Sequence, residues 1–407
     1  MYSTPDVQYP DQQLESLIQA ENDANLWLYN GDVGLVLYHY YRSRYQDDPQ
    51  ALATGLAILE KQIENAGAYL YNFKFAYGVP GLGWLIQFLI NQGVLVDEEA
   101  EALHDIDDHI EKALHWNFSD NLYDLFIGTI GKGMYYLERL EFARQQQDHP
   151  TISELQRRLE AIVENLDHSA ITHPDGVYWL DHYTSGHETH RPGHPYVGIG
   201  LSHGLPSIIY FLGRCYLLGI AGNTCLELIR RATDWLLQRE SSPGHFPTKW
   251  YPDGEVDDSH DLSWCYGVFS AATAFYIAGK LLDDPVKTNK VATIIDHAAA
   301  LSLTEYRVHE SEGLKNIFFC HGTAGISYLF GKMHRLFGKS SWKTAADRWM
   351  AETRSVLRQY PQAKLRQHQR ALLDGLAGVH LVLMAGEQEK PDTGWDRLFL
   401  LDLEQFA

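Results

Sequence analysis

The 407-residue sequence predicts an all-α fold in which about seven inner and seven outer helices close into a double-layered ring, an α/α toroid. Three observations lead to this prediction. A motif, Gly-x-x-[Gly/Ser], recurs seven times, and an apolar helical run follows each copy. Amphipathic stretches separate the copies, with a period of roughly fifty residues. The hydrophobic content of 45% also provides enough apolar side chains for a substantial core.

The inner helices are expected to begin just after the repeated glycines. Only Asp32 and Lys132 carry a charge within the seven apolar runs, and apolar residues occupy nearly every side of each run. A helix of that kind is buried rather than exposed on one face. The repeated glycines are Gly31, Gly78, Gly128, Gly204, Gly267, Gly322 and Gly375.

The outer helices are expected to have one solvated face. In residues 153–163, for example, Leu155, Leu159 and Ile162 recur at helical spacing, and charged residues occupy the other side. A linear solenoid is the alternative arrangement, but its two layers are usually exposed to a similar degree. The much more apolar inner copies favour a ring. Because the repeats run from end to end, we expect residues 1–407 to form a single domain.

Charge and composition restrict the partners of the chain. The formal net charge of -20 argues against a nucleic-acid partner, because phosphates would be repelled. A cationic peptide or a neutral substrate suits this charge better. The N-terminus lacks the features of a standard secretion signal, so we expect a cytoplasmic protein. Residues 262–279 approach membrane-spanning length, but their small and polar side chains and their place in the repeat predict no integral membrane segment.

Two long loops are expected at the mouth of the ring. Residues 173–198 and 241–260 are rich in glycine, proline, histidine and aromatic residues. Each loop directly precedes an inner helix, so both belong at the face where the inner helices begin. We expect them to cover the central opening as a lid.

Metal-binding residue types recur at equivalent positions of neighbouring repeats. The residues just before each repeated glycine should point toward the mouth, and Cys265, Cys320 and His321 hold such positions in copies five and six. Two thiolates and an imidazole are the ligand set of a catalytic zinc site, which keeps a fourth position for water or substrate. Thiolates also select zinc over magnesium or calcium. A chance cluster of core cysteines is the alternative, and the matched positions favour zinc.

The remaining cysteines, Cys215 and Cys225, lie among apolar residues and are expected to be small core side chains. Four cysteines do not make a disulfide framework in a chain of this length, so a reducing compartment is expected.

The expected zinc site favours sulfur chemistry. Zinc bound by two thiolates and a neutral imidazole has no formal net charge, so it activates water only modestly. A thiol that enters the open position loses its proton to become an electron-rich nucleophile. The sequence therefore predicts thiol transfer or thiol addition.

Three phrases resemble the signatures of the lanthionine synthetase C-like family, the cyclases that close thioether rings in lanthipeptides. They are residues 200–204, 264–267 and 320–322, in this order, and the resemblance extends over almost the whole chain. It implies an α/α toroid with a central Zn2+ ion, a dehydrated precursor peptide as substrate and a lanthipeptide dehydratase as a candidate partner. A peptide cysteine would add to the β-carbon of dehydroalanine or dehydrobutyrine, and the enolate would be protonated at its α-carbon to give lanthionine or methyllanthionine.

The resemblance also implies roles for individual residues. The two cysteines and the histidine named above would be the zinc ligands. His203 would be the acid/base beside the metal, because an imidazole titrates near neutrality; helix capping is its alternative role. Asp124 resembles the family's Asp-x-x-x-Gly element and would orient His203 or assist proton transfer, with an ordinary N-cap as the alternative. Tyr266 would donate a hydrogen bond to the developing oxyanion or pack beside the zinc.

One position departs from the family pattern. Many members carry arginine four residues before the first ligand cysteine, where it can stabilise the enolate, but this chain has Asp261 there. Another cation would then have to stabilise the enolate, or the reaction differs in detail. Arg191 and Lys249 in the long loops are the candidates.

Other polar residues have plainer explanations. Asp374 would be a catalytic carboxylate only if a partner faced it, and helix capping accounts for it. The loop histidines could suggest a second metal site, but their irregular spacing favours solvated side chains. These histidines are His182, His187, His190 and His194.

Other functions remain open from the sequence. The chain could add a soluble thiol such as glutathione to dehydroamino acids, or it could be a zinc-containing peptide-binding protein without catalysis, which Asp261 keeps in consideration. A toroidal glycosidase would use paired acids such as Asp124 and Asp374, but it would leave the Cys/Cys/His set unexplained.

Overall fold

The inner helices begin where the repeated glycines predict them, because each glycine is the N-cap of the helix that follows. A computed structural model describes residues 18, 27–69, 71–96, 98–181, 194–258, 262–301, 317–359 and 370–407. Its inner helices are α2 (Asp32–Gln46), α4 (Val79–Asn91), α6 (Thr129–Gln146), α8 (Leu205–Leu217), α10 (Val268–Leu281), α12 (Thr323–Phe337) and α15 (Leu376–Glu387). The outer helices are α3 (Pro49–Asn65), α5 (Glu98–Asp120), α7 (His149–Ser169), α9 (Gly222–Leu237), α11 (Pro285–Ala300) and α13 (Ser340–Gln359).

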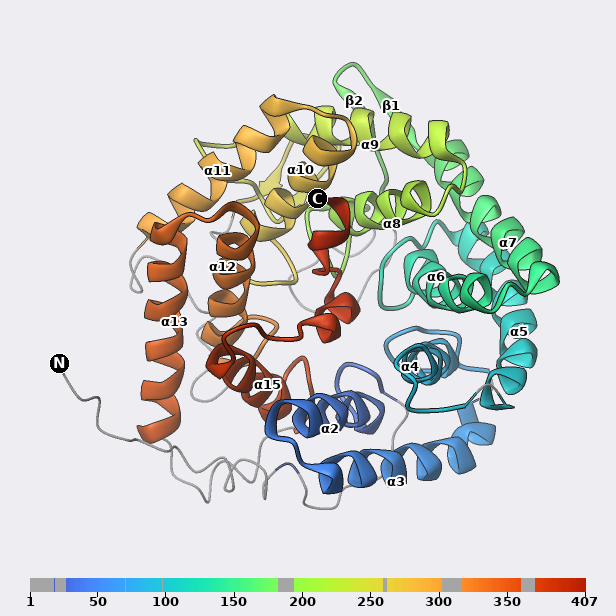
Figure 1. The fold of residues 1–407 in the computed structure, drawn as a ribbon. Coiled ribbons are helices and arrows are strands. Elements are labelled where there is room, and N and C mark those ends of the chain that lie inside the picture. The colour runs from blue at the N-terminus through green and yellow to red at the C-terminus, as the bar shows by residue number, and fades with distance from the viewer. Residues whose placement is uncertain are drawn as a thin grey trace.

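The two layers form a closed ring, which confirms the predicted α/α toroid. Figure 1 shows the inner helices arranged in a circle, with the outer helices around them. The circle closes where α15 packs against α2, a contact that a linear solenoid lacks. Among the described helices, none combines the length and the apolar character that crossing a membrane requires.

The second glycine of the repeated motif is required by a close backbone approach. A Cβ atom at Gly325 would lie 1.8 Å from the carbonyl oxygen of Phe319, and one at Gly378 would lie 1.8 Å from that of Leu372. Any side chain at these positions would therefore push the preceding turn away from the helix. In copy five Ser270 takes this place, and its hydroxyl donates to Trp264 O and accepts from Leu201 N.

The turns before the inner helices are joined to one another by backbone hydrogen bonds. These bonds run around the whole mouth of the ring, so the residues just before the repeated glycines occupy equivalent positions. In order, Leu28 N donates to Ala76 O, Ala76 N to Phe126 O, Leu125 N to Ser202 O, Gly267 N to Ile199 O, Trp264 N to Cys320 O, Cys320 N to Leu373 O, and Leu373 N to Tyr29 O.

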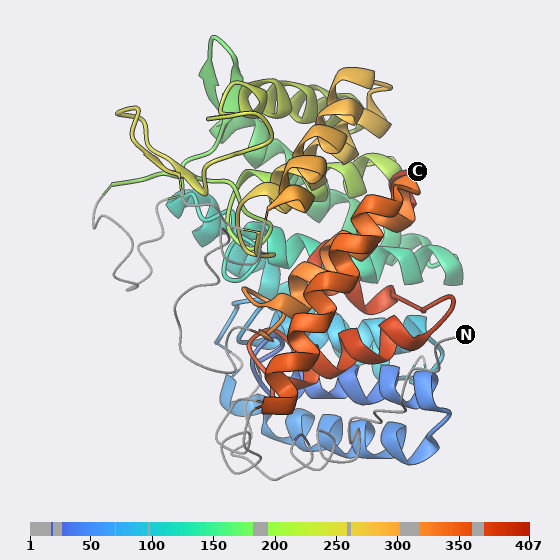
Figure 2. The same cartoon turned by 90° about the vertical axis from the view of Figure 1, so that its left-hand side faces the viewer.

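Short strands bring the two long loops together at this mouth. A first hairpin pairs β1 (Ile171–His173) with β2 (Gly176–Tyr178). A second sheet has the order β3 (Val197–Gly198), β4 (Lys249–Trp250) and β5 (Val256–Asp257), all antiparallel. In Figure 2 these loops project from one face of the ring, while the C-terminus lies toward the opposite face. The described parts of both loops therefore lie on the predicted side.

The interior of the ring is filled by the C-terminal segment, which contains the 3₁₀-helices Gly394–Phe399 and Leu403–Phe406 (Figure 1). Buried charges hold it there, since Lys332 Nζ on α12 lies 2.7 Å from Asp396 Oδ2, and both side chains are almost inaccessible to solvent. The segment also reaches the mouth, because Trp264 Nε1 donates to Phe399 O at 2.7 Å. The sequence did not predict this arrangement.

Replacing Lys332 with methionine is expected to destabilise the fold by about 3–5 kcal/mol, because it leaves a carboxylate buried without its cation. Urea unfolding at pH 7 measures the change. Lys343→Met is the matched control, since the pair of Lys343 and Asp347 lies on the surface with 56% and 63% of the two side chains exposed. An exposed pair contributes less than about 1 kcal/mol. Equal losses in the two variants would contradict the role assigned to Lys332.

Candidate metal centre

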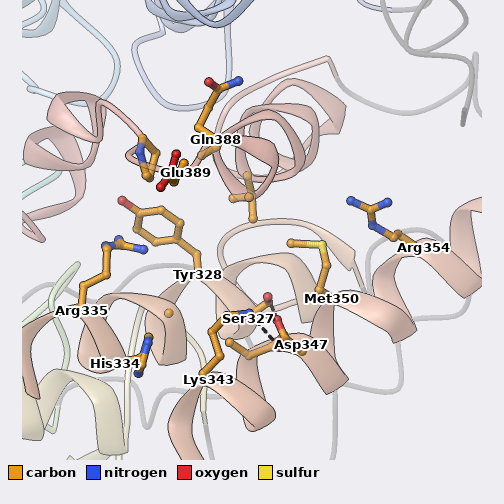
Figure 3. Close-up of a pocket in the computed structure, with 16 residues that line it drawn as sticks. Ser327, Tyr328, His334, Arg335, Lys343, Asp347, Met350, Arg354, Gln388 and Glu389 are labelled. Atoms are coloured by element: carbon orange, nitrogen blue, oxygen red, sulfur yellow. Dashed lines mark hydrogen bonds and ion pairs between the residues drawn. The ribbon is translucent and has the colours of Figure 1, made fainter. Parts of the chain in front are cut away.

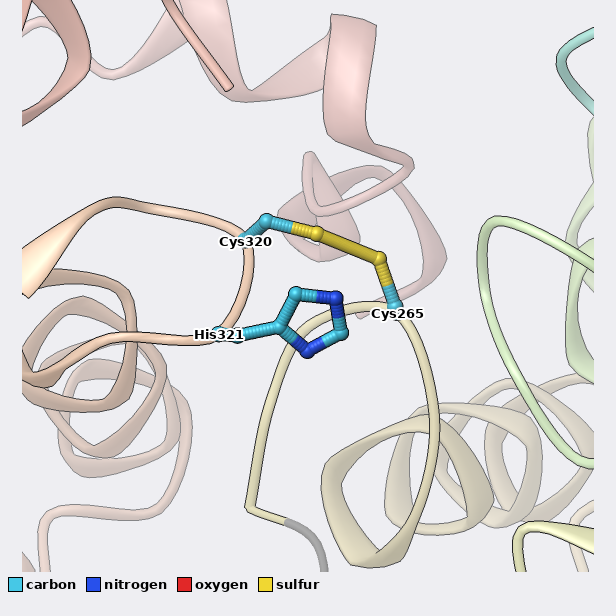
Figure 4. Close-up of side chains that lie close together, drawn as sticks. All are labelled: Cys265, Cys320 and His321. Atoms are coloured by element: carbon cyan, nitrogen blue, oxygen red, sulfur yellow. A yellow bond between two sulfur atoms is a disulfide. The ribbon is translucent and has the colours of Figure 1, made fainter. Parts of the chain in front are cut away.

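Three side chains of the predicted ligand set converge at the mouth of the ring (Figure 4). Cys265 lies two residues before Gly267, the N-cap of α10. Cys320 and His321 directly precede Gly322, the N-cap of α12. Both cysteines are buried and His321 is half-buried. Their possible ligand atoms all lie within 4.8 Å of one another. The equivalent positions in the repeat are therefore close in space as well.

The sulfur atoms of Cys265 and Cys320 form a disulfide, with the two Cα atoms 6.1 Å apart. The sequence did not predict this bond. The other cysteines, Cys215 and Cys225, are free and buried, as expected. Sulfur binds zinc as a thiolate, so the pair can serve as metal ligands only when it is reduced. In the reduced form, two thiolates and one imidazole fit a zinc ion, whose bonds to sulfur and nitrogen are about 2.0–2.3 Å long.

Zinc uptake is therefore expected to depend on reduction. Metal-free protein treated with a reductant should bind about one zinc ion per chain, the stoichiometry of a single catalytic site. Protein oxidised with diamide should bind little zinc and should have two fewer titratable thiols after denaturation, one for each cysteine of the disulfide. Zinc content after dialysis measures the effect, and equal uptake by the two forms would contradict it.

A histidine–carboxylate pair lies next to this cluster. His203 Nδ1 is 3.1 Å from Asp124 Oδ2, and the Asp124 side chain is buried while 23% of that of His203 is exposed. The other oxygen, Asp124 Oδ1, accepts hydrogen bonds from the backbone N–H groups of Ile127 and Gly128 at 2.7 and 3.2 Å. One oxygen of Asp124 therefore accepts hydrogen bonds from the turn before α6, while the other lies next to the His203 ring.

The electrostatics of this pair favour its charged form. Burial alone would raise the pKa of Asp124, but the facing His203 and the two backbone hydrogen bonds lower the pKa below its ordinary value. Burial alone would lower the pKa of His203, but the Asp124 carboxylate raises it above its ordinary value. Since Nδ1 faces the carboxylate, Nε2 is the ring nitrogen that remains to exchange a proton with a substrate.

Tyr266 is a neighbour of both the cluster and His203. It follows Cys265 directly, and its ring centroid is 6.0 Å from that of His203, with the two planes inclined by 29°. Tyr196 is close to Tyr266, and their hydrogen bond contributes, after burial and neighbouring charges, to a raised pKa of Tyr196. No sequence signal pointed to Tyr196, because its place depends on the pairing of the two loops.

Lys132 is a second residue that the sequence did not assign to the site. Its buried ammonium donates to the carbonyl oxygens of Ile127 and Gly128 at 3.2 and 3.3 Å, in the turn that also holds Asp124. Burial lowers the pKa of Lys132 to about 7, although Asp124 opposes this shift. A lysine inside an apolar run was the signal that could have indicated it.

The structure describes two further residues that the sequence analysis singled out, Asp374 and His194. Asp374 accepts a hydrogen bond from Asn30 Nδ2 at 2.9 Å, in the seam between the first and last repeats. His194 is exposed. His182, His187, His190, Arg191 and Asp261 lie outside the described residues.

A pocket of about 320 Å³ lies apart from the proposed metal ligands, between α12, α13 and α15. Its lining includes Tyr328, Arg335 and Met350 (Figure 3). Neither the Cys/Cys/His cluster nor the His203–Asp124 pair contributes to this lining.

Comparison with known proteins shows the family and the fold of the chain. The chain matches the family model described as lanthionine synthetase C-like protein over residues 22–400. Among solved structures, nisin cyclase has a similar fold, with a TM-score of 0.74 and 17% sequence identity, covering 97% of this chain and 98% of that one. No sequence among the curated proteins matches the chain. The family resemblance of the three sequence phrases is thereby confirmed.

Proposed function

The chain belongs to the lanthionine synthetase C-like family, and from this premise we propose that it is a zinc-dependent lanthipeptide cyclase. It would join cysteine thiols of a dehydrated precursor peptide to dehydroalanine or dehydrobutyrine, forming lanthionine or methyllanthionine rings. The observation that carries the proposal is the convergence of Cys265, Cys320 and His321 beside the His203–Asp124 pair. An acid/base next to a thiol-binding centre is what such an addition requires.

The metal ligands and the His203–Asp124 pair would have different roles in this reaction. Zinc held by Cys265, Cys320 and His321 would keep a peptide thiol in its thiolate form near neutral pH. As the new C–S bond forms at the β-carbon, the π electrons move to the α-carbon and its carbonyl oxygen. His203 Nε2 then delivers a proton to the α-carbon, while Asp124 holds the opposite ring nitrogen. The proton that the thiol loses balances the one gained by the product.

Further parts of the proposal follow from the sequence. We place the protein in the cytoplasm, with a lanthipeptide dehydratase as the candidate partner that supplies the substrate. The net charge of -20 suits a lysine-rich peptide. We also treat residues 1–407 as a single domain, since the ring of repeats spans the chain.

The test is incubation of reduced, zinc-loaded protein with a dehydrated precursor peptide. Ring formation consumes free thiols without changing the peptide mass, so thiol counting and mass spectrometry together detect it. Adding glutathione separates the alternatives, because an enzyme that adds a soluble thiol increases the peptide mass. Thiol loss no faster than in a protein-free control would reject catalysis and leave a zinc-containing binding protein.

A further inference from the structure

Three aromatic side chains form a row along the mouth of the ring, from the first repeat to the third. The ring centroids of Trp27 and Tyr77 are 5.4 Å apart, and those of Tyr77 and Phe126 are 6.3 Å apart. The turns that carry these residues are joined by backbone hydrogen bonds, from Leu28 N to Ala76 O and from Ala76 N to Phe126 O. We call Trp27, Tyr77 and Phe126 the aromatic row.

The aromatic row ends at the histidine of the proposed site. The Phe126 ring packs edge-on against the His203 imidazole, with the two centroids 5.1 Å apart. Phe126 is almost fully buried, Tyr77 is half-buried, and 41% of Trp27 is exposed. Exposure therefore increases along the row, from the ring beside His203 to the ring farthest from it in the row.

The repeat places the inner members of the row at the positions that hold the site residues elsewhere. Tyr77 directly precedes a repeated glycine, and His203 and His321 have the same place in their own copies. Phe126 lies two residues before its repeated glycine, as Cys265 does. Copies two and three thus provide aromatic rings where copies four to six provide the metal ligands and the acid/base.

A role in packing alone does not account for this row. A single exposed apolar side chain is common on a protein surface, but Trp27 is continuous with two further rings and with His203. Tryptophan and tyrosine are also enriched where proteins bind partners, because each provides a large contact area with few rotatable bonds. The row has the composition of a binding surface, and it leads to the acid/base.

On the basis of the proposed cyclase function, we propose that the aromatic row binds apolar side chains of the precursor peptide, next to the residues that react at the metal centre. Covering the rings with apolar side chains removes apolar area from water on both partners. Because the row is continuous with His203, a peptide bound along it brings its neighbouring residues to the site. The row takes no part in proton transfer, so it acts on substrate affinity and on the choice of peptide.

Trp27→Ala tests the exposed end of the row, where loss of a side chain disturbs the core least. The probe is a dehydrated precursor peptide with serine in place of its cysteines, so that no ring can form. We expect the Kd measured by isothermal titration calorimetry to increase about 10-fold, as for an aromatic contact in a protein interface. Tyr77→Ala should have a similar effect, whereas Tyr77→Phe keeps the ring and should bind like the wild type.

Trp116→Ala is the matched control, because 66% of Trp116 is exposed on the outer helix α5, outside the aromatic row. This control should leave Kd unchanged. With the reactive peptide, Trp27→Ala should raise KM and leave kcat at saturation unchanged, since the metal ligands and His203 remain. Zinc content and the unfolding midpoint should match those of the wild type.

A second peptide identifies the kind of side chain that the row binds. Replacing the apolar residues beside the reacting positions of the peptide with serine should weaken binding to the wild type. The same change should have little effect on Trp27→Ala, because the contact is already lost. Coupling of Trp27 to lysine residues of the peptide instead would contradict an apolar ligand.

The outcomes separate this inference from the proposed function. Equal binding of the unreactive peptide by wild type, Trp27→Ala and Tyr77→Ala would overturn the role of the row, even if the wild type closes rings. Peptide binding that depends on the row in a protein that closes no rings would overturn the cyclase and retain the row as a peptide-binding surface. A wild type that does not bind the peptide would overturn the inference.

Discussion

Replacing Cys320 with alanine is expected to abolish both zinc binding and ring formation. The variant leaves one thiolate and one imidazole, and two protein ligands do not hold a catalytic zinc ion that normally has three. Without the metal, a peptide thiol keeps its ordinary pKa of about 8.5, so little thiolate is present at neutral pH. Zinc content should fall from about one ion per chain to near zero, and thiol consumption should fall to the rate of the protein-free reaction.

Cys225→Ala is the matched control for this substitution. Cys225 is also buried, but it is a free thiol on α9 and outside the cluster. The control should retain zinc and activity, with at most a modest loss of stability from the smaller side chain. All variants are compared after reduction, so that the disulfide of the wild type does not affect the result. Full zinc loading of Cys320→Ala would refute the assigned ligand set.

Replacing His203 with asparagine is expected to decrease kcat by about 10²–10⁴-fold, the usual contribution of a positioned acid/base. Zinc content should not change, because the three ligands remain. This separation distinguishes proton transfer from metal binding. His194→Asn is the control, since His194 is an exposed loop histidine. A His203→Asn variant with near wild-type kcat would assign protonation of the enolate to another group or to water.

The pH profile of the reaction gives a second test of the same pair. The acid form of His203 is present below its pKa, so kcat should fall as the pH rises through that value. Asp124 raises the pKa of His203, and Asp124→Asn removes this effect. The alkaline limb of the profile should therefore move to lower pH in the variant. A limb that does not move would argue that His203 is not the titrating acid.

The ring and the convergence of the Cys/Cys/His cluster could be predicted from the sequence because both depend on a repeated local pattern. The Gly-x-x-[Gly/Ser] motif marks the turns before the inner helices, and the turns are equivalent because they share backbone hydrogen bonds. The position of Cys265, Cys320 and His321 in those turns was enough to predict that they meet. The pairing of His203 with Asp124 rested on family resemblance, since 79 residues separate them.

Features that depend on long-range packing were not accessible from the sequence. The C-terminal segment has no repeat and only short 3₁₀-helices, so nothing indicated that Asp396 would meet Lys332 inside the ring. Lys249 was one of two residues considered as the cation that stabilises the enolate. Its burial became evident only with the pairing of β3, β4 and β5. The disulfide between Cys265 and Cys320 was likewise unexpected.

The seam between Asn30 and Asp374 joins residues separated by 344 positions in the chain. Linear repeat proteins can fray one unit at a time from a free edge, because each unit contacts only its neighbours. A closed ring has no free edge, so unfolding any one repeat exposes the surfaces of both neighbouring repeats at once. We therefore expect a single cooperative melting transition. We also expect slow folding, because the contact between the first and last repeats closes a very long loop. The entropy cost of closing that loop is incurred before the interface between the two repeats forms.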